Sequence, residues 1–316
     1  EGEGGEEGGE KEEGKKRGEE RKGKKEEGEG KERREKERRE GGEGERGKRG
    51  KKERRKVKRG GTGGEREEKK REEKGRRIVV DVDGLERAAA QASMILLCNP
   101  HNPTGRVLDR SELEAIASIA ADHNLTIVAD EIHADLVYRE AKHIPMETIA
   151  AAAERTVTLT SATKGFNIAG LRASIAHFGS PALKDRFDKR LPERLLGAPG
   201  RLGVAATIAA WSGGEPWLNE VMLYLDRNRQ LVAQWAAKAN LGHHMPEATY
   251  LAWMDCRRLD MPQGQTPQQH FLEHAKVALN EGLDFGEPGE GHVRLNFATS
   301  AEILAAVLGR LGRALP

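Results

Sequence analysis

The sequence has only two cysteines, few aromatic residues and no long apolar run, and each shortage excludes a class of protein. Its apolar stretches are a few residues long, whereas a membrane-spanning helix needs roughly 20. Cys98 and Cys256 lie far apart without ligand spacing, so we expect neither a disulfide framework nor a metal site. The sequence also lacks a secretory signal pattern. We therefore expect a soluble, cytoplasmic protein with no membrane partner.

Residues 1–77 lack almost every residue type. They comprise 31 Lys or Arg, 24 Glu, 20 Gly, Val57 and Thr62, which gives a net charge of +7 against −5 for the remainder. Such a segment has no apolar surface to offset an ordering cost of about 1–2 kcal/mol per residue, so we predict a low-complexity, disordered segment. A polybasic arm for nucleic acid or lipid is an alternative, but the interspersed Glu weakens the field and no aromatic is there to stack on bases. Purine-only codons encode Glu, Gly, Lys and Arg, so we favour an artefactual, translated polypurine tract and expect no nucleic-acid partner.

The remaining residues alternate short apolar strands with amphipathic helices, which is typical of an α/β domain with a mostly parallel sheet. The expected strands are 94–98, 125–130, 156–160 and 173–178, and the expected helices include 83–92, 202–211, 217–239 and one that Ser111 caps. Strands at 249–254 and 293–297 and helices at 267–280 and 301–315 predict a smaller α+β lobe. We place an incomplete large domain at 78–235 and a C-terminal small domain at 236–316.

Polar motifs follow these strands. Lys164 comes just after the strand at 156–160, and a lysine near apolar or cationic groups has a depressed pKa that makes its amine a nucleophile for Schiff-base formation. The alternative is an ordinary surface lysine. The segment Asn99–Gly105 follows one strand, and Asp130-Glu131-Ile132-His133 ends the next. Taken alone, Asp130 is equally consistent with a residue that caps backbone groups at the end of the strand, and His133 with a buried side chain packed in the core.

Together these motifs resemble the fold-type I pyridoxal 5'-phosphate (PLP) enzymes of the aminotransferase class I and II superfamily. The segments Asp130–Tyr138, Lys142–Pro145 and Thr160–Lys164 are similar to its cystathionine β-lyase, or C–S lyase, branch. The resemblance extends over roughly 78–315. It implies the aspartate aminotransferase-like fold of PLP-dependent transferases, a homodimer and an amino-acid substrate.

The resemblance also implies roles for individual residues. Lys164 would bind the cofactor covalently and then remove the substrate Cα proton. Asp130 would pair with the protonated pyridine nitrogen and so keep the ring an electron acceptor. Asn102 and His133 would hydrogen-bond the cofactor's 3'-oxygen.

Three further residues would bind anionic groups. Ser161 and Arg172 match the family's ligands of the cofactor phosphate, and Arg294 would clamp the substrate α-carboxylate. Alternation along a strand allows Arg294 to point to solvent instead. Relatives supply early strands, a second phosphate-binding turn and a ring-stacking aromatic before the position of Ile78, and residues 1–77 contain no aromatic.

We therefore predict a PLP-dependent C–S β-lyase that converts cystathionine or a cysteine S-conjugate to thiol, pyruvate and ammonia. An aminotransferase would use every residue named above and is the first alternative. A non-catalytic remnant or binding module is an alternative of another class, because the early family elements are missing.

Overall fold

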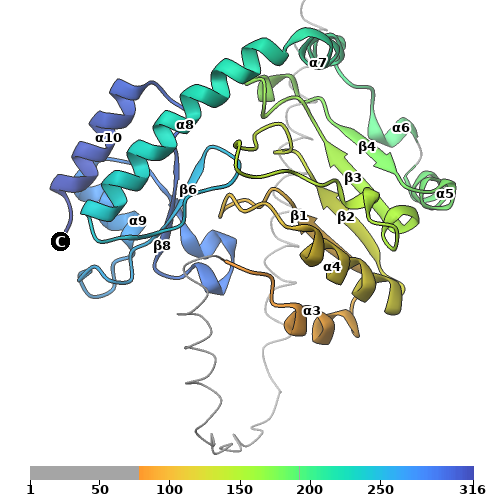
Figure 1. The fold of residues 1–316 in the computed structure, drawn as a ribbon, viewed down its shortest axis with the longest axis horizontal. Coiled ribbons are helices and arrows are strands. Elements are labelled where there is room, and N and C mark those ends of the chain that lie inside the picture. Colours follow the sequence, from red (N-terminus) through yellow and green to blue (C-terminus); the bar gives the residue numbers. More distant parts are fainter. Residues whose placement is uncertain (1–77, 192) are drawn as a thin grey trace, which may run out of the picture. The chain divides into compact units, whose positions relative to one another are not determined.

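The computed structural model describes residues 78–191 and 193–316, and these form two separate β-sheets with their own helices (Figure 1). The predicted disorder of residues 1–77 lies outside the described residues. The proposed division at 78–235 and 236–316 stays a proposal.

The first sheet has the order β1-β2-β3-β4 and is mostly parallel, as predicted. β1 pairs parallel with β2 and β2 with β3, whereas β4 runs antiparallel to β3. The four strands are β1 (Met94–Cys98), β2 (Thr126–Asp130), β3 (Thr156–Thr160) and β4 (Ile175–Phe178). In the register Cys98 faces Asp130 and Asp130 faces Leu159, so the loops after all three parallel strands leave from one edge of the sheet.

Helices α3 (Val82–Ala89) and α4 (Arg110–Asp122) belong to the same lobe as this sheet. Ile95 and Ile127 of the sheet and Leu113 and Ile116 of α4 are buried in one apolar cluster. α4 begins one residue before the Ser111 that we expected to cap it. Asp109 is the N-cap instead, in a reciprocal capping box with Glu112.

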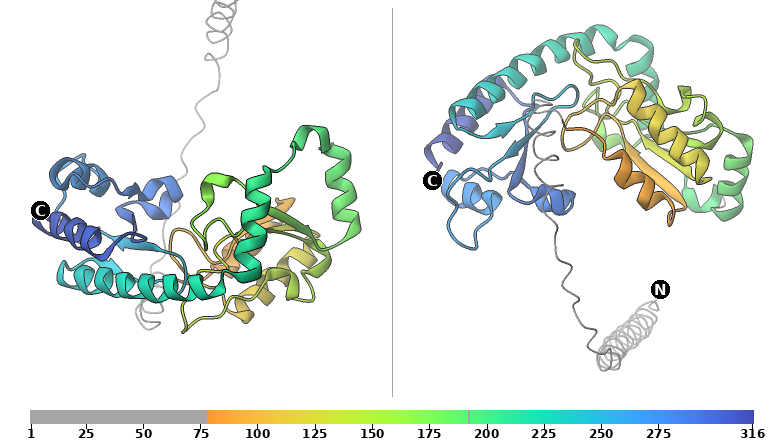
Figure 2. Two further views of the ribbon diagram at one scale, coloured as in Figure 1. Left: turned by 90° about the horizontal axis from the view of Figure 1, so that it is seen from above. Right: turned by 60° about the horizontal axis from the view of Figure 1, so that its bottom comes forward.

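The chain leaves this lobe through a run of helices. They are α5 (Pro181–Arg190), α6 (Glu193–Leu196), α7 (Arg201–Gly213) and α8 (Glu215–Lys238). α8 is one long helix whose far end lies beside α10 (Ala301–Arg313) (Figures 1 and 2).

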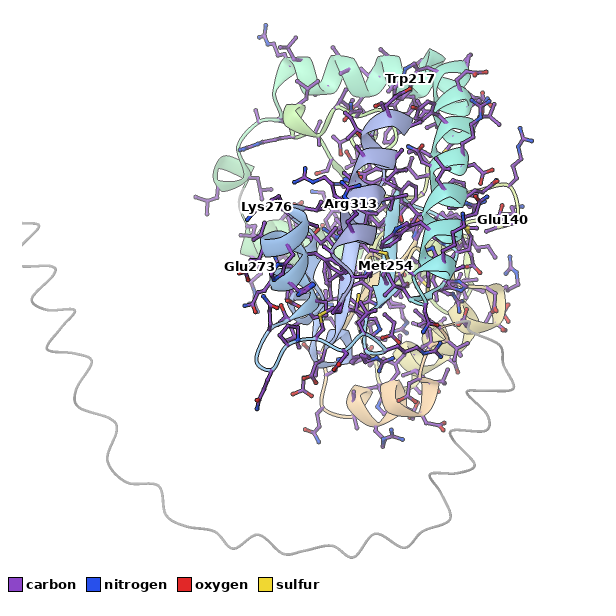
Figure 3. All side chains as sticks on the ribbon, turned by 90° about the vertical axis from the view of Figure 1, so that its left-hand side faces the viewer. Glu140, Trp217, Met254, Glu273, Lys276 and Arg313 are labelled. Carbon is purple, nitrogen blue, oxygen red and sulfur yellow. The ribbon has the colours of Figure 1, made fainter. Side chains whose placement is uncertain are left out.

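The second sheet is antiparallel and has the order β5-β6-β8-β7. Its strands are β5 (Gly242–His243), β6 (Leu251–Asp255), β7 (Asn280–Glu281) and β8 (His292–Asn296). Met254 of β6 lies in a core with side chains of α8 and α10, among them the buried Val232 and Leu304 (Figure 3). The second sheet and its helices therefore have the α+β character that the sequence predicts for the smaller lobe.

The predicted helix at 267–280 is wrong in its second half. α9 (Pro267–His270) continues as a π-helical turn, Phe271–Ala275, and Lys276 then adopts a left-handed conformation with φ 53° that ends the helix (Figure 3 labels Lys276). Val277 and Leu279 are buried while Ala278 and Asn280 are exposed, which is the period of two of an extended strand. Asn280 consequently lies in β7, next to β8.

Within the described residues, no helix is both long and apolar enough to cross a bilayer. β1 is an edge strand of its sheet, and Leu96 on it is 76% exposed. The aligned carboxyl ends of β1, β2 and β3 are where the candidate site lies.

Candidate active site

The turn after β1 holds Asn102 in place by backbone hydrogen bonds. His101 N donates to Arg106 O, and Gly105 N donates to His101 O, both at 2.7 Å. Gly105 has φ +69°, and a Cβ there would lie 2.3 Å from Pro246 Cβ, so the turn needs glycine at this position. The turn thereby presents Asn102 toward the second sheet.

Asn102 contacts Arg294 of β8. Arg294 Nη1 donates to Asn102 Oδ1 at 2.6 Å. Because Oδ1 is the acceptor in this bond, the amide NH₂ of Asn102 is left to donate elsewhere. The predicted carboxylate clamp and the predicted donor to the cofactor's 3'-oxygen are thus in direct contact.

Arg294 is partly buried rather than solvent-facing. Its Nε and Nη2 both donate to Asn280 Oδ1, at 3.2 and 2.7 Å, and its guanidinium carbon lies 4.8 Å from the centroid of the Phe285 ring. Burial lowers the pKa of Arg294, with Tyr250 and Asp284 acting in the opposite direction. An arginine remains charged at neutral pH in such surroundings.

Asp130 ends β2, and its Oδ1 accepts a hydrogen bond from Ile132 N at 3.1 Å. His133 follows in the next turn and is 4% exposed, and its Nδ1 has no hydrogen-bond partner within the described chain. Burial, then the Lys164 charge, and finally Arg294 lower the pKa of His133 to about 4, while Asp130 opposes them. The imidazole is therefore neutral at physiological pH and has an unused nitrogen.

Lys164 lies in the turn after β3. Its Nζ makes no hydrogen bond or ion pair among the described residues, so the amine is available. Lys164 lines a cavity of about 470 Å³ together with Asn167, Trp217, Tyr224 and Tyr250. Asn102, Asp130 and Arg294 do not line this cavity, although Asp130 and Arg294 act with Lys164 on the pKa of His133.

Ser161 and Arg172, predicted to hold a phosphate, lie on either side of the Lys164 turn. Ser161 is buried, and its hydroxyl donates to Ala173 O at 2.5 Å and lies 2.8 Å from Thr163 Oγ1. This bond ties Ser161 to the residue next to Arg172. Arg172 is exposed with φ 50°, a conformation uncommon outside glycine, and within the described residues its side chain has no hydrogen bond or ion pair.

Sequence reasoning missed Tyr250 and Asn280 as site residues. The ring of Tyr250 packs edge-on against His133, with 5.9 Å between centroids, and burial raises its pKa. Its position at the start of a predicted strand was visible in the sequence, but not its proximity to His133. Asn280 was missed because the segment around it was assigned to a helix.

The motif Lys142–Pro145 has a structural role beside Asp130. The buried Glu131 accepts a hydrogen bond from Met146 N at 2.8 Å through Oε1 and lies 3.0 Å from His143 Nε2 through Oε2. Glu131 therefore anchors the 143–146 loop against the end of β2.

The model of the aminotransferase class I and II family matches residues 70–311. The chain belongs to this family. The cystathionine beta-lyase PatB of Bacillus subtilis is 35% identical over 75% of the chain, and the MalY protein of Escherichia coli is 37% identical over 68%. Among solved structures, the PLP-bound C-S lyase of Staphylococcus hominis matches 74% of the chain at 30% identity, with a TM-score of 0.69. The expected family and fold are confirmed.

The chain spans only part of the length of these family members. It covers 62% of PatB, 56% of MalY and 62% of the Staphylococcus hominis lyase.

Proposed function

We propose that the chain is a PLP-dependent C–S β-lyase that cleaves cystathionine or a cysteine S-conjugate to thiol, pyruvate and ammonia. An amine, an acid and a carboxylate-binding arginine are the groups that this chemistry needs close together. The geometry that carries the proposal brings the three groups together: Tyr250 lines one cavity with Lys164 and packs against His133, which follows Asp130, while Arg294 bonds to Asn102 at 2.6 Å. The relatives named as cystathionine beta-lyase and C-S lyase favour C–S cleavage over transamination.

The described residues fit PLP. Within the part of the chain that the structure describes, the Lys164 amine beside the cavity and a buried nitrogen of His133 have no hydrogen-bond partner, and the Asn102 amide is oriented by Arg294. When bound, PLP supplies an aldehyde that bonds covalently to an amine and a ring that accepts an electron pair from the substrate Cα. In this proposal Lys164 is the bonding amine and Asp130 pairs with the ring nitrogen.

The anion and oxygen ligands are assigned in the same way. Asn102 and His133 hydrogen-bond the 3'-oxygen, and the Ser161 hydroxyl and the Arg172 guanidinium hold the phosphate. Ser161 would have to exchange its bond to Ala173 O for one to the phosphate. Arg172 is already exposed, and the left-handed backbone there is the kind of strain that functional sites store.

Lys164 also moves the proton in the catalytic step. Arg294 binds the α-carboxylate of the amino acid, and the freed amine of Lys164 takes the proton from Cα. The electron pair left at Cα then forms a Cα=Cβ double bond as the C–S bond breaks, and the departing thiolate takes up a proton. Water hydrolyses the released enamine to pyruvate and ammonia. His133 with its low pKa remains neutral and does not compete for that proton.

The test is pyruvate release from L-cystathionine in the absence of any added keto acid, with Lys164→Ala as the blank. A lyase releases pyruvate and thiol under these conditions. Product formation only with added keto acid would identify an aminotransferase, and a chain without a cofactor absorbance band would be a non-catalytic module.

We also propose a cytoplasmic homodimer. α7 buries one stripe of small residues, Gly203, Thr207 and Ala210, and exposes a second stripe of large apolar ones, Val204, Ile208 and Trp211. A second copy would cover this exposed stripe. Ile208→Glu should shift the protein to a monomer in light scattering, and an unchanged mass would contradict the proposed interface.

The cytoplasmic location is supported by the cysteines. The free thiols of Cys98 and Cys256 suit a reducing compartment.

A further inference from the structure

Arg294 is held from three sides: Asn102 lies in the turn after β1, whereas Asn280 and Phe285 belong to the same lobe as Arg294 itself. Asn280 faces Arg294 directly in the antiparallel register of β7 and β8, and Trp253 faces it from β6. Residues opposite each other in such a pair are close enough for their side chains to touch. The hydrogen bonds from Arg294 to Asn280 Oδ1 are the result.

The hydrogen bonds of Arg294 determine which of its N–H groups remain available to bind a ligand. Of its five N–H groups, Nε and one on Nη2 are taken by Asn280, and one on Nη1 is taken by Asn102. One N–H on Nη1 and one on Nη2 have no acceptor among the residues that the structure describes. Two donors on neighbouring nitrogens suit the two oxygens of a carboxylate.

The partners of Arg294 hold it without neutralising it. Both acceptors are neutral amide oxygens, and the third contact is the face of Phe285, which itself packs edge-on against Trp253. Arg294 has no ion pair with a carboxylate in the part of the chain that the structure describes. The cation therefore keeps its full charge for a ligand while its orientation is fixed.

We propose that Asn280 is a positioning residue that directs the Nη1 and Nη2 hydrogens of Arg294 to the substrate α-carboxylate. This inference rests on the proposed function, because that function assigns the carboxylate to Arg294. Asn280 acts through Arg294 and touches no reacting atom. A neutral side chain is essential at position 280, because a carboxylate there would compete with the substrate for the same cation.

The decisive variant is Asn280→Asp, which keeps the shape and adds the competing charge. We expect KM for L-cystathionine to rise about tenfold or more, which corresponds to the weakening of one hydrogen bond between charged groups, with kcat nearly unchanged. The dissociation constant of propionate, a carboxylate without an amine, should rise in parallel when measured by calorimetry. Asn280→Ala should raise KM less, because it frees the guanidinium without pairing it.

An S-substituted cysteine and its methyl ester separate this role from a structural one. The ester has no carboxylate, so Asn280→Asp should leave its KM unchanged while that of the free acid rises. The matched control is Asn219→Asp, the same change at an exposed position of α8, which should affect neither substrate. Equal effects of Asn280→Asp on acid and ester would overturn the proposal.

Arg294→Gln distinguishes the two levels of inference. If it removes the preference for acid over ester while Asn280→Asp and Asn280→Ala change nothing, Asn280 has no positioning role and the proposed carboxylate site stands. If Arg294→Gln leaves the preference intact, the carboxylate binds elsewhere, and both inferences fail. If a variant at position 280 has a lower melting temperature, only the ratio of its KM for the acid to its KM for the ester is compared with that of the wild type, because a general loss of stability affects both substrates alike.

Discussion

Arg294 Nη1 donates to Asn102 Oδ1 at 2.6 Å, although 192 positions of the sequence separate the two residues. One lies on the small-lobe sheet and the other in the turn after β1. Binding of a carboxylate at Arg294 therefore acts directly on the amide that is proposed to contact the cofactor oxygen. A change at either residue should alter both ligand sites.

Lys164→Ala should abolish covalent cofactor attachment, because Lys164 is the amine beside the cavity and His133. Borohydride reduction of the PLP-loaded protein followed by peptide mapping should label Lys164 alone. Lys184 is the control, since its amine is already paired with Asp188 at the surface. A label on Lys184 or Lys189 would refute the assignment.

Asp130→Asn should permit cofactor binding but lower turnover by orders of magnitude. Without the charge, the ring nitrogen loses its proton and becomes a weaker electron acceptor. The asparagine oxygen still accepts the bond from Ile132 N, so the fold should be kept. Near-normal turnover of the loaded variant, with an unchanged melting temperature, would show that Asp130 is only a cap.

Much of this fold could be predicted because local pattern and tertiary structure agree. The strands Met94–Cys98 and Thr156–Thr160 were placed at the observed residues, since short runs of apolar and β-branched residues between polar loops favour strands, even though Leu96 on the edge strand β1 is exposed. The helix cap was misplaced because Asp109 and Ser111 are both good capping residues and the choice depends on the entry of the chain.

The site could be predicted only as a list of residues. The segment 277–281 directly follows a helix, but it also has the alternating pattern of a strand. In the structure the left-handed backbone of Lys276 ends the helix, so the segment is extended. With that segment assigned to a helix, Asn280 could not be placed opposite Arg294. Contacts such as Tyr250 with His133 join distant segments, and no local pattern records them.

Glu131→Leu should destabilise the protein by about 1–3 kcal/mol, because it leaves the buried Met146 N–H without an acceptor. Glu131→Gln keeps an oxygen in place and should cost less. The control is Glu154→Leu at an exposed position, expected within about 0.5 kcal/mol of the wild type. The free energy of unfolding in urea is the measurement, and equal values for Glu131→Leu and Glu154→Leu would refute the anchoring role.

His133 should make stability depend on pH below neutrality. Its pKa is about 4 in the folded protein and about 6.5 in an unfolded chain, so between these values the unfolded state binds more protons. Stability due to a neutral His133 is therefore complete above pH 6.5 and is lost as the pH falls toward 4. At pH 5 the loss should be about 2 kcal/mol relative to pH 7.

His133→Gln removes the titrating group and keeps a polar side chain. Other histidines also titrate, among them His101 and His243, whose pKa values burial lowers. The informative quantity is therefore the difference between wild type and variant in urea unfolding free energy at pH 7 and at pH 5. The variant should lose less stability than the wild type over this interval. A parallel loss in both proteins would mean that His133 titrates normally in the fold and does not remain neutral beside Lys164.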